Sequence, residues 1–183
     1  YKDLNLSSPL REGPVRRILV YFGASDEKKL TEKTLLAFLQ LNRKDILLDI
    51  VLSPQSTQIK KILKLSKKFK NIKIHTELKS LANLILKADL AVGACGTTSW
   101  ERCCLGLPSI VITIAENQKP IAKELHKKEI VRWLGDSNNV TKNSIYNELR
   151  TTINQSLKNW SETCKLVTDG LGVKKVVSLM TFD

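Results

Sequence analysis

The chain has 183 residues, 42% of them hydrophobic, which is enough for one ordinary domain with a buried core. Its 30 basic and 18 acidic side chains give a formal net charge of +12, which favours an anionic partner without choosing between nucleic acid and a phosphorylated ligand. No apolar run is long enough to cross a bilayer and the first residues lack the pattern of a signal peptide, so we expect no membrane span and a cytoplasmic location. Because the chain begins with Tyr1 rather than Met, we also expect it to be a piece of a longer protein.

The cysteines argue against a metal centre. Cys95, Cys103, Cys104 and Cys164 contain no CxxC pair, and adjacent cysteines on a helix point in different directions. Reduced thiols of a cytosolic protein therefore fit better than a disulfide framework or a zinc site, and we predict no bound metal.

Short apolar runs alternate with helical stretches along the chain. The first run, residues 17–22 (RILVYF), is rich in β-branched and aromatic side chains and ends at a glycine, as a buried strand does. Thr31 is placed to cap the helix that follows. By the same criteria we expect strands at residues 17–22, 46–52, 72–75, 90–92, 109–114 and 131–134. We expect helices at residues 32–41, 56–69, 78–87, 100–105 and 119–127, from 141 onward, and at 173–180.

These strands are continuously apolar rather than alternating, which is typical of a parallel sheet covered by helices on both faces. Right-handed crossovers then favour a doubly wound, Rossmann-like α/β fold with strand order 3-2-1-4-5-6. We predict one such domain over residues 1–183, with helices at its C-terminal end. Its first and fourth strands are neighbours where the winding reverses, and ligands of such folds bind in the crevice at that point.

Glycine-containing turns follow the first and the fourth predicted strands, so both are expected to rim this crevice. Residues without a Cβ let a ligand approach the backbone closely, and the helix after the second turn directs free N–H groups at such a ligand. A diphosphate suits this arrangement best; the alternative is a pair of tight turns that bind nothing. The contacts predicted in the two turns are Gly23, Ser25, Gly93, Gly96, Thr97, Thr98 and Ser99.

Neither turn has the spacing of a common nucleotide motif. The sequence contains neither the GxGxxG of a dinucleotide site nor the GxxxxGK[ST] of a nucleoside-triphosphate loop. A nicotinamide cofactor and ATP are therefore disfavoured, and we predict no cofactor.

Glu101 has two competing interpretations. One turn into the predicted fourth helix, its carboxylate can accept hydrogen bonds from the two hydroxyls of a ribose. Alternatively, residues 98–101 form a capping box, in which Glu101 reaches back to the N–H of Thr98. Local spacing favours the cap.

Other polar side chains are expected near the same crevice. Asn117 and Gln118 follow the fifth strand and offer amides to a phosphate or sugar, although Asn117 can instead cap the next helix. His75 ends a strand near the crevice, whereas His126 lies late in a lysine-rich helix. Neither histidine has a partner at a spacing that indicates a nucleophile or a metal site, so both are interpreted as structural. Asp26 fits a turn or capping role better than a phosphate contact.

The lysines of residues 56–69 bear on the nucleic-acid alternative. At about 100° per residue, Lys60, Lys61, Lys64, Lys67 and Lys68 share one side of the helix, and apolar side chains share the other. This is the pattern of a solvated face, so a nucleic-acid stripe is the less favoured interpretation.

Residues 93–102 (GACGTTSWER), followed by CLGLP at 104–108 and by Asn117-Gln118, resemble the C-terminal half of the UDP-sugar hydrolase family of pseudaminic acid and spore coat polysaccharide biosynthesis. Enzymes of this kind remove UDP from UDP-2,4-diacetamido-2,4,6-trideoxy-altropyranose and are related to the two-domain GT-B glycosyltransferases. Residues 17–26, 88–90 and 169–172 are also similar to the family, so the resemblance covers nearly the whole chain.

The resemblance implies roles for individual residues. Glu101 would bind the ribose hydroxyls, residues 96–99 the diphosphate, and Asn117 and Gln118 the phosphate or the sugar. The loop at 76–78, with Leu78, would border the uracil. Ala24 stands where the family commonly has a second glycine, which makes close approach of a ligand to that loop less certain.

The resemblance also implies what this chain lacks. The histidine proposed to activate water in the family belongs to an N-terminal domain, which would precede Tyr1. We therefore expect the chain to bind UDP or a UDP-sugar without turning it over, with no catalytic residue of its own. A sugar transferase of the same architecture and a basic, non-catalytic module for nucleic acid or another acidic partner remain as alternatives.

Overall fold

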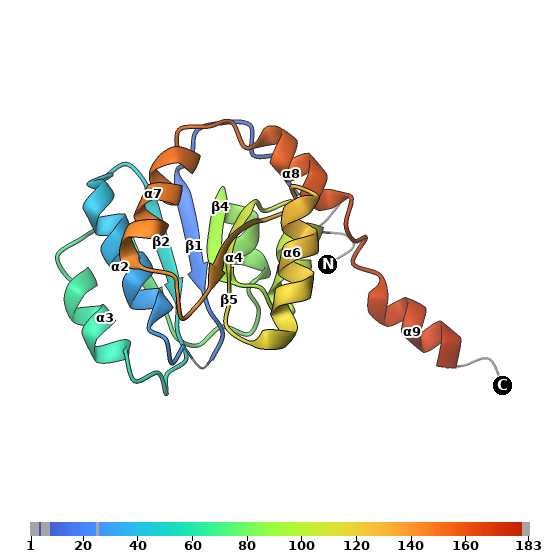
Figure 1. Cartoon of the computed structure of the whole chain (residues 1–183), viewed down its shortest axis with the longest axis horizontal. Helices are drawn as coiled ribbons and strands as arrows, with labels where there is room; N and C mark the ends of the chain where they lie inside the picture. Colours follow the sequence, from blue (N-terminus) through green and yellow to red (C-terminus); the bar gives the residue numbers. More distant parts are fainter. Residues whose placement is uncertain (1–3, 5–7, 25, 181–183) are drawn as a thin grey trace.

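A computed structural model of the chain describes residues 4, 8–24 and 26–180. Its centre is a six-stranded sheet in which every neighbouring pair of strands is parallel (Figure 1). The order is β3-β2-β1-β4-β5-β6, which confirms the predicted doubly wound arrangement. The strands are β1 (Arg17–Tyr21), β2 (Leu47–Val51), β3 (Ile72–His75), β4 (Leu90–Ala94), β5 (Ser109–Thr113) and β6 (Arg132–Asp136).

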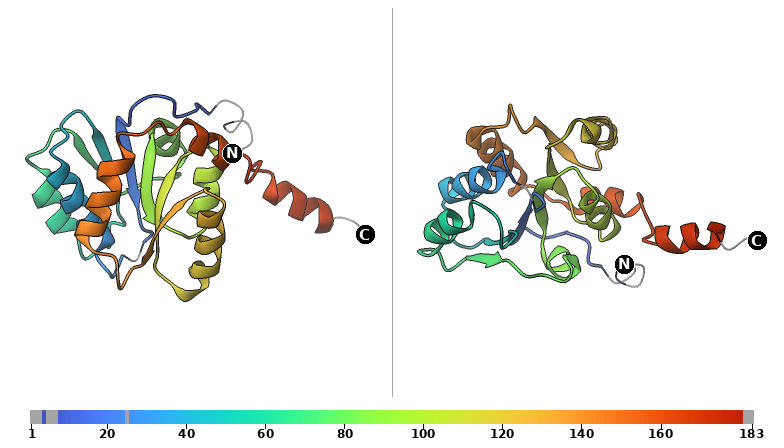
Figure 2. Two further views of the ribbon diagram at one scale, coloured as in Figure 1. Left: turned by 45° about the horizontal axis from the view of Figure 1, so that its top comes forward. Right: turned by 90° about the horizontal axis from the view of Figure 1, so that it is seen from below.

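Helices cover both faces of the sheet (Figure 2). Successive residues of a strand point to opposite faces, so Ile18 and Val20 pack in one apolar cluster and Leu19 in another. The first face carries α2 (Leu30–Leu41), α3 (Ile59–Ser66) and α7 (Lys142–Thr152). The second carries α4 (Ala82–Lys87), α5 (Thr98–Cys104), α6 (Lys119–Lys127) and α8 (Lys158–Lys165).

The predicted cap of α2 is wrong. Thr31 lies inside the helix and is fully buried, whereas the Asp26 carboxylate accepts hydrogen bonds from the N–H groups of Leu30 (2.8 Å) and Thr31 (2.7 Å). Lys29 is left-handed (φ 55°), so the chain reverses just before the helix and brings Asp26 back over its first turn. This confirms the capping role assigned to Asp26.

Two other helices are shorter than predicted. Residues 56–58 and 67–69 lie outside α3, and residues 78–81 precede α4 as an irregular segment. The lysine face of α3 is exposed as predicted, but Leu63, assigned to the apolar side, is 48% exposed as well. The buried stripe of α3 is therefore narrow and centres on Ile62.

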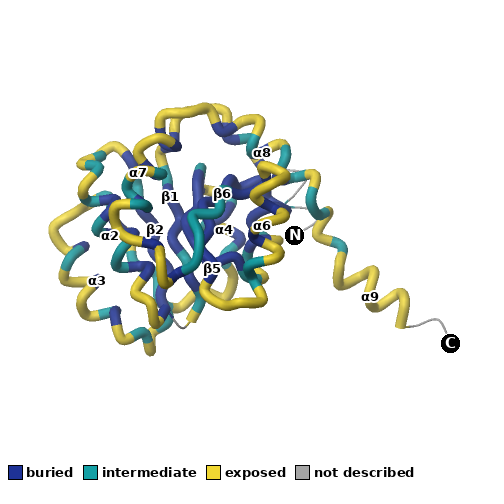
Figure 3. The backbone as a smooth tube through the Cα atoms, in the orientation of Figure 1, coloured by how far each residue is buried: buried dark blue, intermediate teal, exposed yellow. Residues whose placement is uncertain are grey.

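The last helix, α9 (Gly172–Met180), projects away from the body of the domain, and Figure 3 shows it exposed along its length. Its apolar side chains Val173, Val176, Val177, Leu179 and Met180 are all more than half exposed. Among the residues that the structure describes, no helix combines the length and apolar character that a membrane span requires.

Candidate functional site

The loops after β1 and β4 leave the same edge of the sheet side by side. β1 pairs with β4, and Tyr21, the last residue of β1, lies opposite Gly93. The winding of the sheet reverses between these two strands. The predicted adjacency of the two turns is therefore confirmed, and they emerge where ligands of doubly wound folds bind.

Gly93 does not lie in the second turn. It lies inside β4 and is buried, and a Cβ there would collide with the backbone oxygen of Tyr21 and with Nη1 of Arg102. The glycine thus lets a neighbouring strand and a buried guanidinium approach the β4 backbone. The sequence pattern could not separate this packing role from a turn, because both call for a residue without a side chain.

The turn itself leaves three consecutive backbone donors unbonded. The N–H of Ser99 donates to Gly96 (2.9 Å) and that of Trp100 to Thr97 (3.1 Å). The N–H groups of Gly96, Thr97 and Thr98 have no hydrogen-bond partner in the part of the chain that the structure describes. Because α5 has only seven residues, these amides rather than a long helix dipole are what the turn offers an anion.

Gly96 needs no special backbone conformation. Its φ is not positive, and a Cβ there would meet only Nε2 of Gln118, at 3.6 Å. Gln118 lies in η1 (Glu116–Gln118), and its Oε1 accepts a hydrogen bond from the N–H of Ile114 (3.0 Å), which leaves its amide NH₂ free beside Gly96. Asn117 is exposed and lines none of the cavities described below.

A cavity of about 510 Å³ opens at the carboxyl ends of β1, β2 and β3 and against α5. Thr98 and Glu101 line one wall, and Leu78 and Thr76 line another. The structure thus brings together Glu101, assigned to the ribose, Thr98, assigned to the diphosphate, and the loop assigned to the uracil. The remaining wall includes Tyr21, Ala24, Val51, Leu52, Ser53, Lys79, Ser80 and Leu81.

The predicted capping box at Glu101 is absent. The N-cap of α5 is Thr97, with no side-chain capping bond, and the Glu101 carboxylate makes no hydrogen bond or ion pair with any described residue. The structure therefore corrects the interpretation that local spacing favoured. The carboxylate has no described partner on the wall of the cavity, three residues beyond the end of the free-amide turn.

A second, smaller cavity of about 290 Å³ lies between the loops after β1 and β5. Gly23, Ala24 and Gln118 line it, and Ala24 borders the larger cavity as well. Gly23 has a φ of +90°, which explains the glycine by backbone conformation. Ser25, the other residue predicted in this loop, lies outside the described residues.

Ser99 faces the interior rather than the crevice. Its side chain is 2% exposed, and its hydroxyl accepts a hydrogen bond from Nη2 of Arg102 (2.9 Å). The same nitrogen donates to the backbone oxygen of Ala94 (2.8 Å). The predicted contact at Ser99 thus lies beneath the turn, linked to an arginine that the sequence analysis did not single out.

Arg102 was missed because buried arginines are rare and nothing local marks this one. The available signal was its position: three residues after Ser99, on the face of α5 that must turn toward the sheet. Burial lowers the pKa of Arg102, and no described carboxylate lies within ion-pair distance.

The cysteines and histidines have structural surroundings. All four cysteines are buried, and none of them forms a disulfide with a described residue. Nε2 of His75 lies 2.7 Å from the buried Asp49, and Nδ1 of His126 lies 3.2 Å from the backbone oxygen of Val131. No cluster of three potential metal ligands occurs in the residues that the structure covers.

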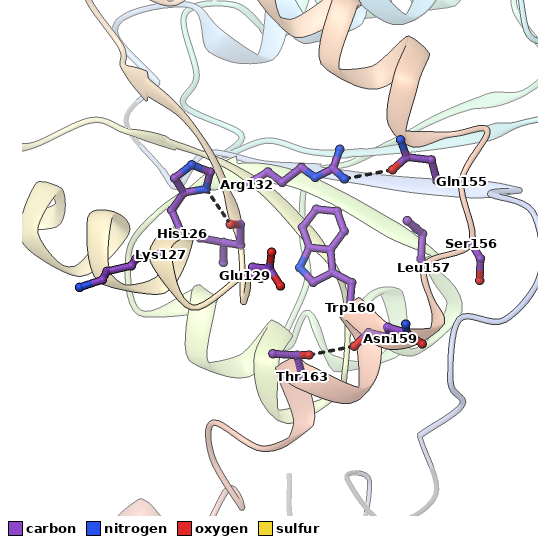
Figure 4. Close-up of a pocket in the computed structure, with 11 residues that line it drawn as sticks. His126, Lys127, Glu129, Arg132, Gln155, Ser156, Leu157, Asn159, Trp160 and Thr163 are labelled. Carbon is purple, nitrogen blue, oxygen red and sulfur yellow. Dashed lines mark hydrogen bonds between the residues drawn. The ribbon is translucent and has the colours of Figure 1, made fainter.

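A third cavity, about 520 Å³, lies at the amino ends of the strands, where β6 begins (Figure 4). Arg132 stacks over Trp160 at 5.0 Å and donates to Glu148 (2.8 Å) and Gln155 (3.0 Å). The Trp160 indole donates to the backbone oxygen of Ile130 (2.7 Å). This cavity matches the one beside Glu101 in size, but its central polar groups already bond one another.

Comparison with known proteins gives partial sequence matches. No protein-family model matches the chain. It is 32% identical over 116 residues to the uncharacterized protein MJ1062 of Methanocaldococcus jannaschii, covering 62% of this chain and 24% of that protein. It is also 32% identical over 109 residues to the spore coat polysaccharide biosynthesis protein SpsG of Bacillus subtilis, covering 59% and 32%.

Solved structures resemble the whole fold. MurG of Acinetobacter baumannii superposes with a TM-score of 0.70 at 17% identity, over 98% of this chain and 52% of that one. UDP-GlcNAc 2-epimerase of Neisseria meningitidis, solved bound to UDP-GlcNAc, gives 0.68 at 17% identity, over 92% and 45%. The chain therefore shares its doubly wound α/β fold with one part of each of these structures. The chain spans about half of these solved structures and a third or less of the curated relatives.

Proposed function

We propose that this domain binds the UDP part of a UDP-sugar. The observation that carries the proposal is the unbonded carboxylate of Glu101, which lines a cavity at the switch point of the sheet together with Thr98. A carboxylate left without a partner at this position suits the two hydroxyls of a ribose. The free N–H groups of residues 96–98 are then placed for the diphosphate, and the loop carrying Leu78 for the base.

The comparisons support this proposal in kind. SpsG is named as a spore coat polysaccharide biosynthesis protein, and the similar epimerase structure contains UDP-GlcNAc. Both fit a domain that handles a nucleotide-linked sugar. Gln118, whose amide lies beside Gly96, is the residue we assign to the phosphate or sugar side, with Asn117 as its exposed neighbour.

We propose further that the parent protein is a two-domain UDP-sugar hydrolase in which this chain is the C-terminal half. The basis is the resemblance of residues 93–102 to that family and the greater length of the related proteins. On this proposal the other domain supplies the histidine that activates water, and this domain holds the leaving UDP. The sugar would be a pseudaminic acid precursor or another surface-polysaccharide unit.

A sugar transferase is the second candidate. This candidate is supported by the fold that the chain shares with MurG, which matches over 98% of the chain. Product analysis of the full-length protein separates the two candidates. Release of free sugar and UDP from the UDP-sugar without an acceptor supports a hydrolase, whereas strict dependence on an acceptor supports a transferase.

The nucleotide itself is tested by calorimetric titration of UDP into the chain. We expect saturable binding, and Glu101→Ala weakens it about tenfold or more because hydrogen bonds to a charged group are lost. Glu124→Ala, which removes an exposed carboxylate from α6, is the matched control and leaves affinity unchanged. No saturation by millimolar UDP would contradict the proposal, and salt-sensitive binding of nucleic acid independent of Glu101 would support the basic-module alternative.

A further inference from the structure

We propose that Arg102 is a positioning residue for the diphosphate: its buried guanidinium ties the two ends of the residue 96–98 turn together, and the bound diphosphate is its counter-charge. This inference rests on the proposed UDP function and assigns a role to a residue that would not touch the ligand. The part of UDP on which Arg102 acts is the diphosphate group and not the nucleoside.

The contacts of Arg102 bracket the turn. Nη2 donates to the backbone oxygen of Ala94, the last residue of β4, and to the hydroxyl of Ser99, just beyond the three free N–H groups. One nitrogen therefore fixes the residues on both sides of the turn. Gly93 makes the arrangement possible, because a Cβ there would occupy the space of Nη1.

The guanidinium is incompletely satisfied. Arg102 is 3% exposed, its Nε has no hydrogen-bond partner, and no described carboxylate lies within ion-pair distance. A buried charge without a partner destabilises a fold, and a compensating charge close to it reduces that cost. An anion held by the amides of residues 96–98 would be separated from Arg102 only by the backbone of the turn and by Ser99.

The nearby thiols, and more weakly the carboxylate of Glu101, are the competing counter-charges. Burial raises the pKa of Cys95, so that thiol stays neutral. The hydrogen bond from Cys164, followed by the charge of Arg102, lowers the pKa of Cys103. A Cys103 thiolate is therefore the alternative that an experiment has to separate from the diphosphate.

Arg11 provides a matched control. It is also 3% exposed, and its hydrogen bonds to described residues all go to backbone oxygens, those of Ala88, Leu105, Ile85 and Pro9. These contacts lie at the amino end of β4, whereas Arg102 lies at its carboxyl end. Arg11→Met thus removes a buried guanidinium from the same layer without disturbing the turn.

The experiment measures the affinities of UDP and of uridine by NMR titration of the wild-type chain, Arg102→Met, Arg102→Lys, Cys103→Ala and Arg11→Met. We expect Arg102→Met to weaken UDP about tenfold to a hundredfold and uridine less than about twofold, because a charge effect acts only on the diphosphate. Arg102→Lys keeps the charge and gives an intermediate loss of UDP affinity. Arg11→Met and Cys103→Ala leave the ratio of the two affinities unchanged.

Several results would overturn the inference. Equal losses of UDP and uridine affinity in Arg102→Met would make the arginine merely structural, and a changed ratio in Cys103→Ala would assign the charge to the thiolate. If Arg102→Met does not fold, Ser99→Ala serves instead, since it removes one acceptor of Nη2 and should lower UDP affinity selectively by about threefold. Wild-type protein that binds neither UDP nor uridine would instead refute the proposed function itself.

Discussion

The sheet has an amino edge, where its parallel strands begin, and a carboxyl edge, where they end. The two differ in how completely their polar groups are bonded. At the amino edge, all three nitrogens of Arg11 donate to backbone oxygens, and Arg132 donates to three side chains and stacks on Trp160. At the carboxyl edge, Glu101 is unbonded and Arg102 uses a single nitrogen. Cavities of similar size occur at both edges, so volume does not distinguish them.

The difference teaches that a binding site is marked by what the protein leaves unsatisfied. Buried or half-buried polar groups in folded proteins nearly always have partners, and exceptions require an explanation. At the carboxyl edge three amides and one carboxylate without a described partner lie within residues 96–102, together with one guanidinium whose buried Nε is unbonded. A ligand with hydroxyls at one end and negative charge at the other would bond the carboxylate and the amides and would oppose the charge of the guanidinium.

The largest effect at the carboxyl edge is expected from Gly93→Val. A side chain there would collide with β1 and with Arg102, so we expect the free energy of unfolding to fall by about 3 kcal/mol or more. Urea denaturation followed by circular dichroism measures the loss. Gly13→Ala, where a Cβ meets nothing within 4 Å, is the control and should change stability little.

Glu101→Ala tests the nucleoside end of the same edge. We expect the wild-type chain to prefer UDP over 2′-deoxy-UDP, because the 2′-hydroxyl donates to Glu101. The variant should lose most of that preference, because it has no carboxylate to accept the hydrogen bond. The unfolding free energy should stay within about 0.5 kcal/mol of the wild type, since no described residue bonds the carboxylate. A preference that survives intact in the variant would remove Glu101 from the ribose.

Gly96→Ala sharpens the role of the turn. The protein itself has room for the methyl group, so stability should change by less than about 1 kcal/mol. A ligand held against the backbone does not have that room, and UDP affinity should fall about tenfold, measured by calorimetry. An unchanged affinity would mean that the diphosphate does not approach Gly96.

Asp26→Ala tests a carboxylate of the carboxyl edge that is already bonded. Loss of the cap on α2 should cost about 1–2 kcal/mol of stability, because two buried N–H groups lose their acceptor. The UDP affinity of the folded variant should remain within about twofold of the wild-type affinity, since the Asp26 carboxylate already has its partners. A large selective loss of UDP affinity would instead place Asp26 in the site.

The smallest expected effect is at the exposed pair Arg43 and Asp45, before β2. Hydrogen bonding by Arg43 lowers the pKa of Asp45 to about 2. Because that pKa is lowered in the folded state, the stabilisation is complete above the ordinary value of 3.8 and is lost as the pH falls through about 2. In Arg43→Ala, NMR titration should find the Asp45 pKa back near its ordinary value.

Strand order and layering followed from the sequence because they depend on local apolar runs. The six strands were predicted within two residues at each end, and continuous apolar character correctly indicated two covered faces. The adjacency of the loops after β1 and β4 then followed from the handedness of crossovers. These rules need only the order of elements along the chain.

Details that depend on chain reversal were not accessible. Thr31 had the better local spacing for a cap, but the left-handed Lys29 brings Asp26 over the helix instead. Similarly, the spacing between Thr98 and Glu101 favoured a capping box that does not form. In both cases a dihedral set by tertiary packing decided the hydrogen bond.

The sequence by itself determined the class of the fold, the edge at which ligands of such folds bind, and the segment around residues 93–101 that offers backbone donors and a carboxylate. Only the tertiary structure decided which of those groups are free, that Gly93 serves packing, and that Arg102 lies beneath the turn. The reason is physical: hydrophobic periodicity is written in neighbouring residues, whereas the satisfaction of a polar group depends on atoms that the fold brings from elsewhere in the chain.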